Sequence, residues 1–191
     1  METMSFTKTH LVLLIVSTTL LFAPTTYAIR TPQARVWTIC KPTTNPVLCY
    51  KTILPRALSS PKFNMYKALE EEIKATQVQV VKTVGHIATA ILTSNDKNIA
   101  DALAICKDQY GMIVDAVAES VLLVSKRNAG EARFKFSGVI SYNSACKDVF
   151  VESNNAIAPF AADAQAVVDH ASNCLDIMKA IEDRDRRLGK Y

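Results

Sequence analysis

The fold is decided by residues 99–151, which read IADALAICKDQYGMIVDAVAESVLLVSKRNAGEARFKFSGVISYNSACKDVFV. Two series of mostly apolar residues in this stretch step by three and four positions, which keeps side chains on one face of a helix. The series are Leu103, Cys106, Tyr110 and Ile113, followed by Val139, Tyr142, Cys146 and Val149. Residues 126–130, Lys-Arg-Asn-Ala-Gly, lie midway between the two series and are the best turn candidate.

Two antiparallel helices bring these series face to face in a single register. Facing residues of an antiparallel pair share one index sum, and this holds for Leu103 with Val149, Cys106 with Cys146, Tyr110 with Tyr142, and Ile113 with Val139. We therefore predict a helical pair closed by a Cys106–Cys146 disulfide, with the two tyrosines as a packed aromatic pair. On the entropic account, a bridge over a loop of this length restricts the unfolded chain by about 4 kcal/mol.

The N-terminus has the features of a secretory signal peptide. Lys8 precedes an apolar run at residues 11–22, LVLLIVSTTLLF, and Ala28 is a small residue suited to signal-peptidase cleavage. The run is too short to span a bilayer, and we expect no later membrane span. We predict a signal peptide at 1–28 and a secreted mature chain at 29–191, a compartment in which disulfides form.

The composition favours one helical domain. Of the 191 residues, 49% are hydrophobic and 21% are charged, and only 5 are glycine and 7 are proline. These are globular proportions with few turns. The net charge of +4 is too small to indicate a nucleic-acid partner. The charged runs at 70–72 and 184–187 are interpreted as solvated helix faces, because charged residues are mostly exposed.

Within residues 29–58, a short helical hairpin precedes the long helices. Turn-forming residues occupy positions 41–46, between Cys40 and Cys49. This arrangement predicts two short helices closed by a Cys40–Cys49 bridge. Trp37 is expected to pack the hairpin onto another part of the protein, because an indole buries a large area.

Two further amphipathic helices complete a bundle over residues 59–191. The first is expected to begin with Ser60 as N-cap and Pro61 as first residue, and to end near Thr93, where Ser94-Asn95-Asp96 closes it and can cap the next helix. Its apolar stripe comprises Leu69, Ile73, Thr76, Val80, Val84, Ile87 and Ile91. The last helix is expected from about Pro159 to Leu188, with the stripe Ala162, Ala166, Val167, His170, Cys174, Ile177 and Ile181.

Short connections between four long helices predict an all-α, antiparallel up-down-up-down bundle. Gly111 and Gly138 lie inside the second and third helices. Because glycine lowers helix propensity by up to about 1 kcal/mol, we expect a close helix approach at both positions.

Catalytic and metal-binding patterns are not found in the sequence. It contains no Gly-x-Ser-x-Gly, His-Glu-x-x-His or phosphate-binding glycine loop. His170 and Cys174 share a helix face and could form half a metal site, but structural zinc needs four ligands. We interpret both as core residues, with Cys174 a buried free thiol, and predict no catalytic residue, metal or cofactor.

Four motifs together resemble the plant invertase and pectin methylesterase inhibitor family. They are Ile39-Cys40-x8-Cys49, Ala102-Leu103-x-x-Cys106-Lys107-x-x-Tyr110, Asp115-Ala-Val-x-Glu-Ser120 and Ser144-x-Cys146-Lys147-Asp148-x-Phe150. Four cysteines allow three connectivities, and the resemblance implies Cys40–Cys49 with Cys106–Cys146. It also implies an N-terminal helical hairpin attached to an antiparallel four-helix bundle.

The resemblance implies a secreted, non-enzymatic inhibitor that blocks the active-site cleft of pectin methylesterase or of cell-wall or vacuolar invertase, at one-to-one stoichiometry. Invertase inhibitors of the family often carry Pro-Lys-Phe before the fourth cysteine, where this chain has only Arg133-Phe134. The tripeptide at residues 61–63 is interpreted as part of a helix start. Residues 136–140 look more like the Ser-Ala-Ala-Leu run of methylesterase inhibitors and of pollen proteins described as invertase inhibitors. The choice of target stays open.

Basic side chains suit a cleft lined with carboxylates. The candidate target contacts are Lys67, Glu71, Lys74 and Lys82 on the first long helix, and Arg127, Glu131 and Arg133 near the turn between the second and third long helices. An alternative function is a wall-associated helical protein without an enzyme target. Such a protein would bind acidic pectin through its positive charge, or a small apolar ligand in the bundle core.

Overall fold

The computed structural model describes residues 31–153 and 156–190, and within these ranges it contains seven helices and no strand. The predicted signal peptide at 1–28 lies outside the described residues. The segment Thr31–Tyr191 is a single compact unit. The all-α prediction is confirmed for the described part of the chain.

Helices α2 (Pro32–Cys40) and α3 (Pro46–Ser59) form the expected N-terminal hairpin. The Cys40–Cys49 disulfide closes it with a Cα–Cα distance of 5.5 Å, and both cysteines are buried. The turn between the helices is held against the last helix by hydrogen bonds to two of its side chains. Thr44 donates from its backbone N–H and its hydroxyl to Asp176 Oδ2, at 2.6 and 2.8 Å, and the Asn45 N–H donates to Asn173 Oδ1 at 2.8 Å.

The ring contact observed for Trp37 lies within the hairpin itself. Its ring packs edge-on against Tyr50 of the same hairpin, with centroids 5.9 Å apart, and the residue is 45% exposed. The hairpin is attached to the bundle by packing of α3 against α4 and by the hydrogen bonds from its turn to α8. Hydrogen-bonding residues on a distant helix leave no periodic signal in the sequence, which is why this contact was not foreseen.

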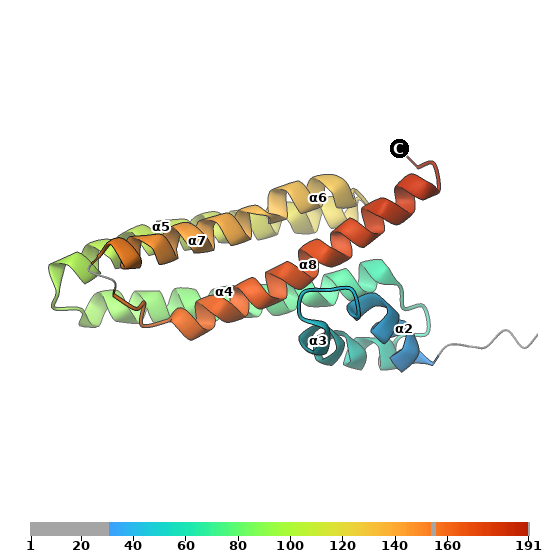
Figure 1. The fold of residues 1–191 in the computed structure, drawn as a ribbon, viewed down its shortest axis with the longest axis horizontal. Helices are drawn as coiled ribbons and strands as arrows, with labels where there is room; N and C mark the ends of the chain where they lie inside the picture. Colours follow the sequence, from blue (N-terminus) through green and yellow to red (C-terminus); the bar gives the residue numbers. More distant parts are fainter. Residues whose placement is uncertain (1–30, 154–155, 191) are drawn as a thin grey trace, which may run out of the picture. The chain divides into compact units, whose positions relative to one another are not determined.

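The bundle consists of α4 (Met65–Thr93), α5 (Lys97–Ser125), α6 (Ala129–Phe136), α7 (Gly138–Glu152) and α8 (Ala161–Arg187). Helix α4 packs against α5 and α8, and α5 packs against α6 and α7, both of which also contact α8. Figure 1 shows α6 and α7 continuing one another alongside α5, so together they occupy the place of the third long helix. The four-helix bundle is therefore confirmed, with its third helix in two pieces.

The division between α6 and α7 falls at Ser137, next to Gly138. Ser137 keeps right-handed helical dihedral angles, φ −60° and ψ −24°, so the two pieces form a nearly continuous helix. A Cβ on Gly138 would lie 3.6 Å from the Ala116 Cβ of α5 and 3.1 Å from Tyr142 Cε2. The contact with α5 is an ordinary van der Waals one, and the tight contact is with Tyr142 of α7 itself, so the structure does not show an unusually close helix approach at Gly138. The close approach predicted at Gly111 is wrong, because no atom lies within 4 Å of a Cβ built there.

The Cys106–Cys146 disulfide confirms the predicted register of the central pair. Its Cα–Cα distance is 4.7 Å, and Leu103, Ile113 and Val139 of the facing stripes are fully buried. The predicted packing of Tyr110 against Tyr142 is wrong. The Tyr110 hydroxyl donates to Asn143 Oδ1 at 2.7 Å, and its ring packs edge-on against Phe160, with centroids 6.2 Å apart.

The start of α4 also differs from the prediction. Asn64 caps the helix, its Oδ1 accepting from the Lys67 N–H at 3.1 Å, so residues 61–63 belong to the connection from α3 and not to the helix. The expectation that residues 94–96 close α4 and cap α5 is confirmed: Ser94 is the C-cap of α4, and Asp96 is the N-cap of α5, its carboxylate accepting from the Asn98 N–H at 2.8 Å. In the apolar stripes, Val84 and Ala162 are exposed, contrary to expectation, and Thr83 is buried in α4.

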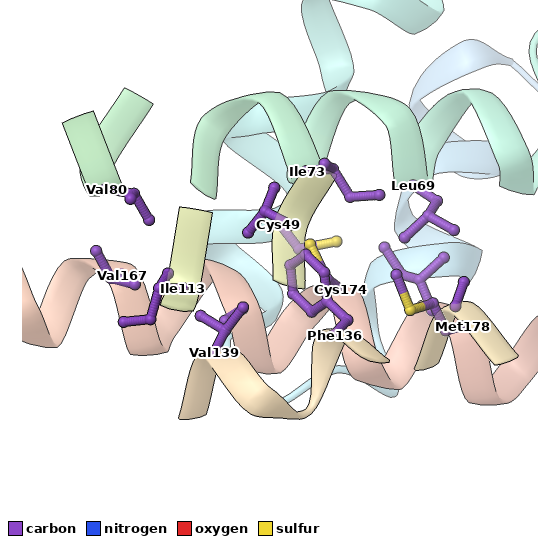
Figure 2. Close-up of a cluster of buried hydrophobic side chains, with 14 of the residues drawn as sticks. Cys49, Leu69, Ile73, Val80, Ile113, Phe136, Val139, Val167, Cys174 and Met178 are labelled. Atoms are coloured by element: carbon purple, nitrogen blue, oxygen red, sulfur yellow. The ribbon is translucent and has the colours of Figure 1, made fainter. Parts of the chain in front are cut away.

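The core runs along the bundle and is predominantly apolar. Figure 2 shows Ile73 of α4, Phe136 of α6 and Cys174 of α8 close together at its centre, with Val80, Ile113 and Val167 further along. Cys174 is a buried free thiol.

A polar pair interrupts this core between α4 and α8. The carboxylate of Glu72 is fully buried, and its Oε2 lies 2.9 Å from Nδ1 of His170, which is 7% exposed. Glu72 Oε1 has no hydrogen-bond partner. The interpretation of 70–72 as a solvated face is therefore wrong at Glu72, whose position on the helix directs its side chain inward. His170 is a core residue as expected, but a paired one.

Next to this pair, the hydroxyl oxygen of Thr76 lies at 3.6 Å from the sulfur of Cys174. Burial raises the pKa of the Cys174 thiol well above its usual value, and the nearby Glu72 charge raises it further, while the Thr76 hydrogen bond opposes the rise. A thiol in this setting is held in its protonated, unreactive form.

Candidate target-binding surface

The predicted contacts at the start of α4 take part in ion pairs within the protein. Lys67 lies 2.6 Å from Glu70, and Lys74 lies 3.1 Å from Glu71, which also pairs with Arg56 of α3 at 3.6 Å. Glu71 therefore joins the hairpin to the bundle. Lys74 is the most exposed of the three predicted residues, with 64% of its side chain accessible.

Lys82 lies further along α4 and contacts α8. Its Nζ is 2.7 Å from Asp163 Oδ1, and Asp163 also pairs with His86. Hydrogen bonds and charge from Lys82 and His86 hold the pKa of Asp163 below its ordinary value of 3.8. More than half of the Lys82 side chain stays exposed, so it can contact a partner while keeping its place on α8.

Between these lysines, α4 presents apolar side chains to solvent. Val78 is 64% exposed and Val81 is 70% exposed. Their spacing from Lys74 and Lys82 places all four residues on one side of the helix. We call Lys74, Val78, Val81 and Lys82 the α4 face. Neither valine is among the contacts predicted from the sequence, although two valines three positions apart on the polar side of the helix were a readable signal.

The turn between α5 and α6 is held by Tyr66 of α4. The Tyr66 hydroxyl donates to the backbone carbonyl of Arg127 at 2.9 Å, and the Arg127 guanidinium lies over the Tyr66 ring, 4.2 Å from its centroid. Glu131 caps α6 with Asn128, whose Oδ1 accepts from the Glu131 N–H and whose Nδ2 donates to Glu131 Oε2. Arg133 Nε donates to Glu182 of α8 at 3.0 Å.

An exposed aromatic residue stands next to this turn. Phe134 is 76% exposed and borders a groove of about 450 Å³ between α5 and the junction of α6 with α7. Met112 and Tyr142 also line the groove, and the Lys135–Glu119 ion pair, 2.9 Å long, lies in its lining. The hydrogen bond from Lys135 to Glu119 raises the pKa of this lysine. Exposed aromatic side chains are frequent anchors of protein interfaces.

The predicted contacts do not form one patch. Lys67 and Arg127 lie at the same end of the bundle, because Tyr66 links the start of α4 to the α5–α6 turn. Lys82 lies about 22 Å further along α4, from the helical rise per residue. Glu71 and Glu131 have their side chains engaged within the protein. The surface therefore offers two regions, the α4 face and the α5–α6 turn with Phe134.

The part of the chain that the structure describes has no group of three or more His, Cys, Asp or Glu side chains placed to hold a metal ion. None of its helices combines the length and the apolar character needed to cross a membrane.

Together, these features define a helical bundle held by two disulfides, with mixed basic and apolar helix faces on its surface. The family model of plant invertase/pectin methylesterase inhibitors matches residues 34–177. The chain belongs to this family.

Two solved structures have a similar fold. A pectin methylesterase inhibitor from Arabidopsis thaliana, at 17% sequence identity, superimposes with a TM-score of 0.59 over 76% of this chain and 95% of the other. A mutant form of a pectin methylesterase inhibitor from Arabidopsis, at 18% identity, gives a TM-score of 0.63 over 74% of this chain and 93% of the other. No curated protein matches the sequence.

Proposed function

We propose that this protein is a secreted inhibitor that binds pectin methylesterase or invertase of the plant cell wall and blocks the active-site cleft. The observation that carries the proposal is the family match, which extends from the N-terminal hairpin into α8. An inhibitor of this kind performs no chemistry of its own, and its affinity comes from a preformed surface.

The rigidity of the bundle supports this role. Two disulfides constrain the hairpin and the central pair, and Tyr66 fixes the turn that presents Arg127. Side chains and loops that are already ordered lose little conformational entropy on binding. A helix face held in this way can enter an enzyme groove without reorganisation.

We propose Lys67, Lys74, Lys82, Arg127 and Arg133 as the target contacts, with Phe134 as an added apolar anchor. Catalytic carboxylates in the target cleft would attract these basic groups. Glu71 and Glu131 are proposed to support the surface from within, since each already pairs inside the protein.

The target is identified by titrating the oxidised mature chain against a plant pectin methylesterase and, separately, a cell-wall invertase near apoplastic pH. We expect residual activity of one enzyme to fall linearly to an end point at one equivalent. Full activity of both enzymes with excess inhibitor would refute the proposal.

The contact set is tested by charge reversal at Arg133, with Lys147→Glu as a matched reversal on α7. We expect Arg133→Glu to weaken inhibition at least about tenfold, the effect of losing one charge-assisted contact. Equal inhibition constants for the two variants would remove Arg133 from the set.

Secretion is part of the same proposal. The N-terminal sequence of the protein recovered from the medium of expressing plant cells is expected to begin at Ile29. An intact N-terminus on an intracellular product would contradict it. The alternative function, pectin binding without an enzyme target, predicts salt-sensitive binding and no inhibition of either enzyme.

A further inference from the structure

Arg127 has an unusual backbone conformation. Its φ is +62°, and in the described ranges no other residue except a glycine has a positive φ. Residues with a Cβ adopt this conformation at a cost in free energy and persist in it when their surroundings hold them there. Tyr66 holds Arg127 at two points, by the hydrogen bond to its carbonyl and by the ring beneath its guanidinium.

The Arg127 side chain borders a second feature, a pocket of about 500 Å³ at the end of the bundle. The pocket is lined by Asn64, Tyr66, Arg127, Arg184, Asp185 and Lys190. The Arg184 guanidinium lies 5.9 Å from the centroid of the same Tyr66 ring. The ring of Tyr66 thus lies near the guanidinium groups of both Arg127 and Arg184, and Lys190 also lines the pocket.

Among the described residues, the lining of this pocket carries three cationic side chains and one carboxylate. Asp185 is 6% exposed, so the interpretation of 184–187 as a solvated face is wrong at this residue. Its Oδ1 accepts from Arg184 Nε at 2.9 Å and from Nη2 at 2.8 Å, and lies 3.8 Å from Lys190 Nζ. The carboxylate of Asp185 therefore pairs with both Arg184 and Lys190. The ion pairs of the described residues include none for Arg127.

We propose that this pocket binds the carboxylates of an acidic polysaccharide, with Arg127 as the principal contact. A guanidinium presents a fork of N–H donors that matches a carboxylate. The ring of Tyr66 is buried beneath Arg127 and unavailable for stacking on a sugar, so recognition is by charge. The choice of polymer rests on the proposed function, which places the protein in the plant cell wall. The acidic polysaccharide of that wall is de-esterified pectin.

The exposed neighbours of the pocket favour a polymer over a single small anion. Lys126 and Arg187 are exposed, and they stand next in sequence to residues at this end of the bundle. Several cations along one end of a molecule can contact successive carboxylates of one chain. Such binding falls steeply as salt rises, because each contact releases counterions from the polymer.

The test measures binding of the oxidised mature chain to polygalacturonate and to fully methyl-esterified galacturonan, without any enzyme. The two polymers share a backbone and differ in charge. We expect binding to the acidic polymer at about 50 mM salt, a steep loss by about 300 mM, and no binding to the ester. Equal binding to both polymers, or to neither, would overturn the proposal.

Paired variants locate the site. Arg127→Asn with Lys190→Gln removes two charges from the pocket, and asparagine tolerates positive φ. Lys107→Gln with Lys147→Gln removes two charges from exposed positions beside the Cys106–Cys146 bridge, about 30 Å away along α5. We expect about tenfold weaker binding for the pocket variant and less than about twofold for the control. Equal weakening would show that net charge alone attracts the polymer and would refute the site.

Thermal unfolding of both variants checks that each is folded. Because no enzyme is present, failure of this binding assay leaves the inhibition proposal unaffected. Failure of inhibition likewise leaves the binding result intact.

Discussion

The buried Glu72–His170 pair offers the sharpest test of the core. His170→Leu would leave the Glu72 carboxylate fully buried, with Oε2 deprived of its only observed partner and Oε1 already without one. Removing one member of a buried pair costs about 3–5 kcal/mol, because an uncompensated charge stays in the interior. In a domain of this size, each kcal/mol lowers Tm by about 2–4 °C, so we expect a loss of about 10 °C.

The double variant Glu72→Leu/His170→Leu should recover most of this loss. Replacing a buried ion pair by apolar residues of similar volume is often neutral or stabilising. Glu72→Leu alone should cost only about 1–2 kcal/mol, because His170 is at the edge of the core and loses one acceptor. The cycle therefore predicts a coupling of at least about 2 kcal/mol between the two residues.

The assay is guanidinium unfolding followed by circular dichroism, with both disulfides oxidised and the free energy extrapolated linearly to water. Glu119 and Lys135 provide the control pair, 2.9 Å apart but roughly half exposed, and their coupling should stay below about 1 kcal/mol. If the two single substitutions at Glu72 and His170 add to within about 0.5 kcal/mol, the pair does not stabilise the core as argued.

Three further outcomes follow from the structure. Cys174 should resist a thiol reagent at pH 8 in the native protein and react once it is unfolded, because burial raises the pKa of its thiol; fast native labelling would contradict its burial. Gly111→Ala should raise the free energy of unfolding by up to about 1 kcal/mol, whereas Gly138→Ala should gain less because its Cβ would crowd Tyr142; equal gains in chemical denaturation would argue against this crowding. Wild type should be more stable than Asp163→Asn above about pH 4, with the difference shrinking as pH falls further, because the folded-state pKa of this carboxyl lies below its unfolded value of 3.8; a difference that grows in acid would contradict the assigned pairing.

The sequence allowed the bundle to be predicted because apolar periodicity and cysteine spacing constrain each other. Cys106 and Cys146 fixed a register that the facing stripes supported independently, and Cys40 and Cys49 enclosed a recognisable turn. The third helix was predicted in one piece, and its division at Ser137 is slight, since that residue keeps helical dihedral angles.

The incorrect predictions concern residues whose tertiary contacts the sequence does not show, most of them polar. Glu72 resembles its neighbours in the sequence, and only the position of α8 shows that it faces His170. Asp185 is similar, since burial separates it from the charged run around it. Phe160 displaced Tyr142 as the partner of Tyr110 because packing across three helices is not fixed by the register of two.

Prediction of the target contacts from the sequence has the same limit, because it does not include the tertiary contacts of each residue. Basic residues on exposed faces can be chosen from a sequence, but their internal partners cannot. Lys82 was placed on a solvent face and is also bound to Asp163 of α8, and Glu131 is engaged in a helix cap. Val81 and Phe134 are exposed to an extent that composition alone does not show.

The proposed function depends on occupation of the active-site cleft of a cell-wall enzyme by this protein. Its most direct test is the kinetics of the inhibited enzyme at several fixed concentrations of the mature protein, with substrate concentration varied. We predict that the apparent KM rises with inhibitor while kcat is unchanged, as expected for exclusion of substrate from the cleft. A fall in kcat at constant KM would place the inhibitor away from the cleft and contradict the account.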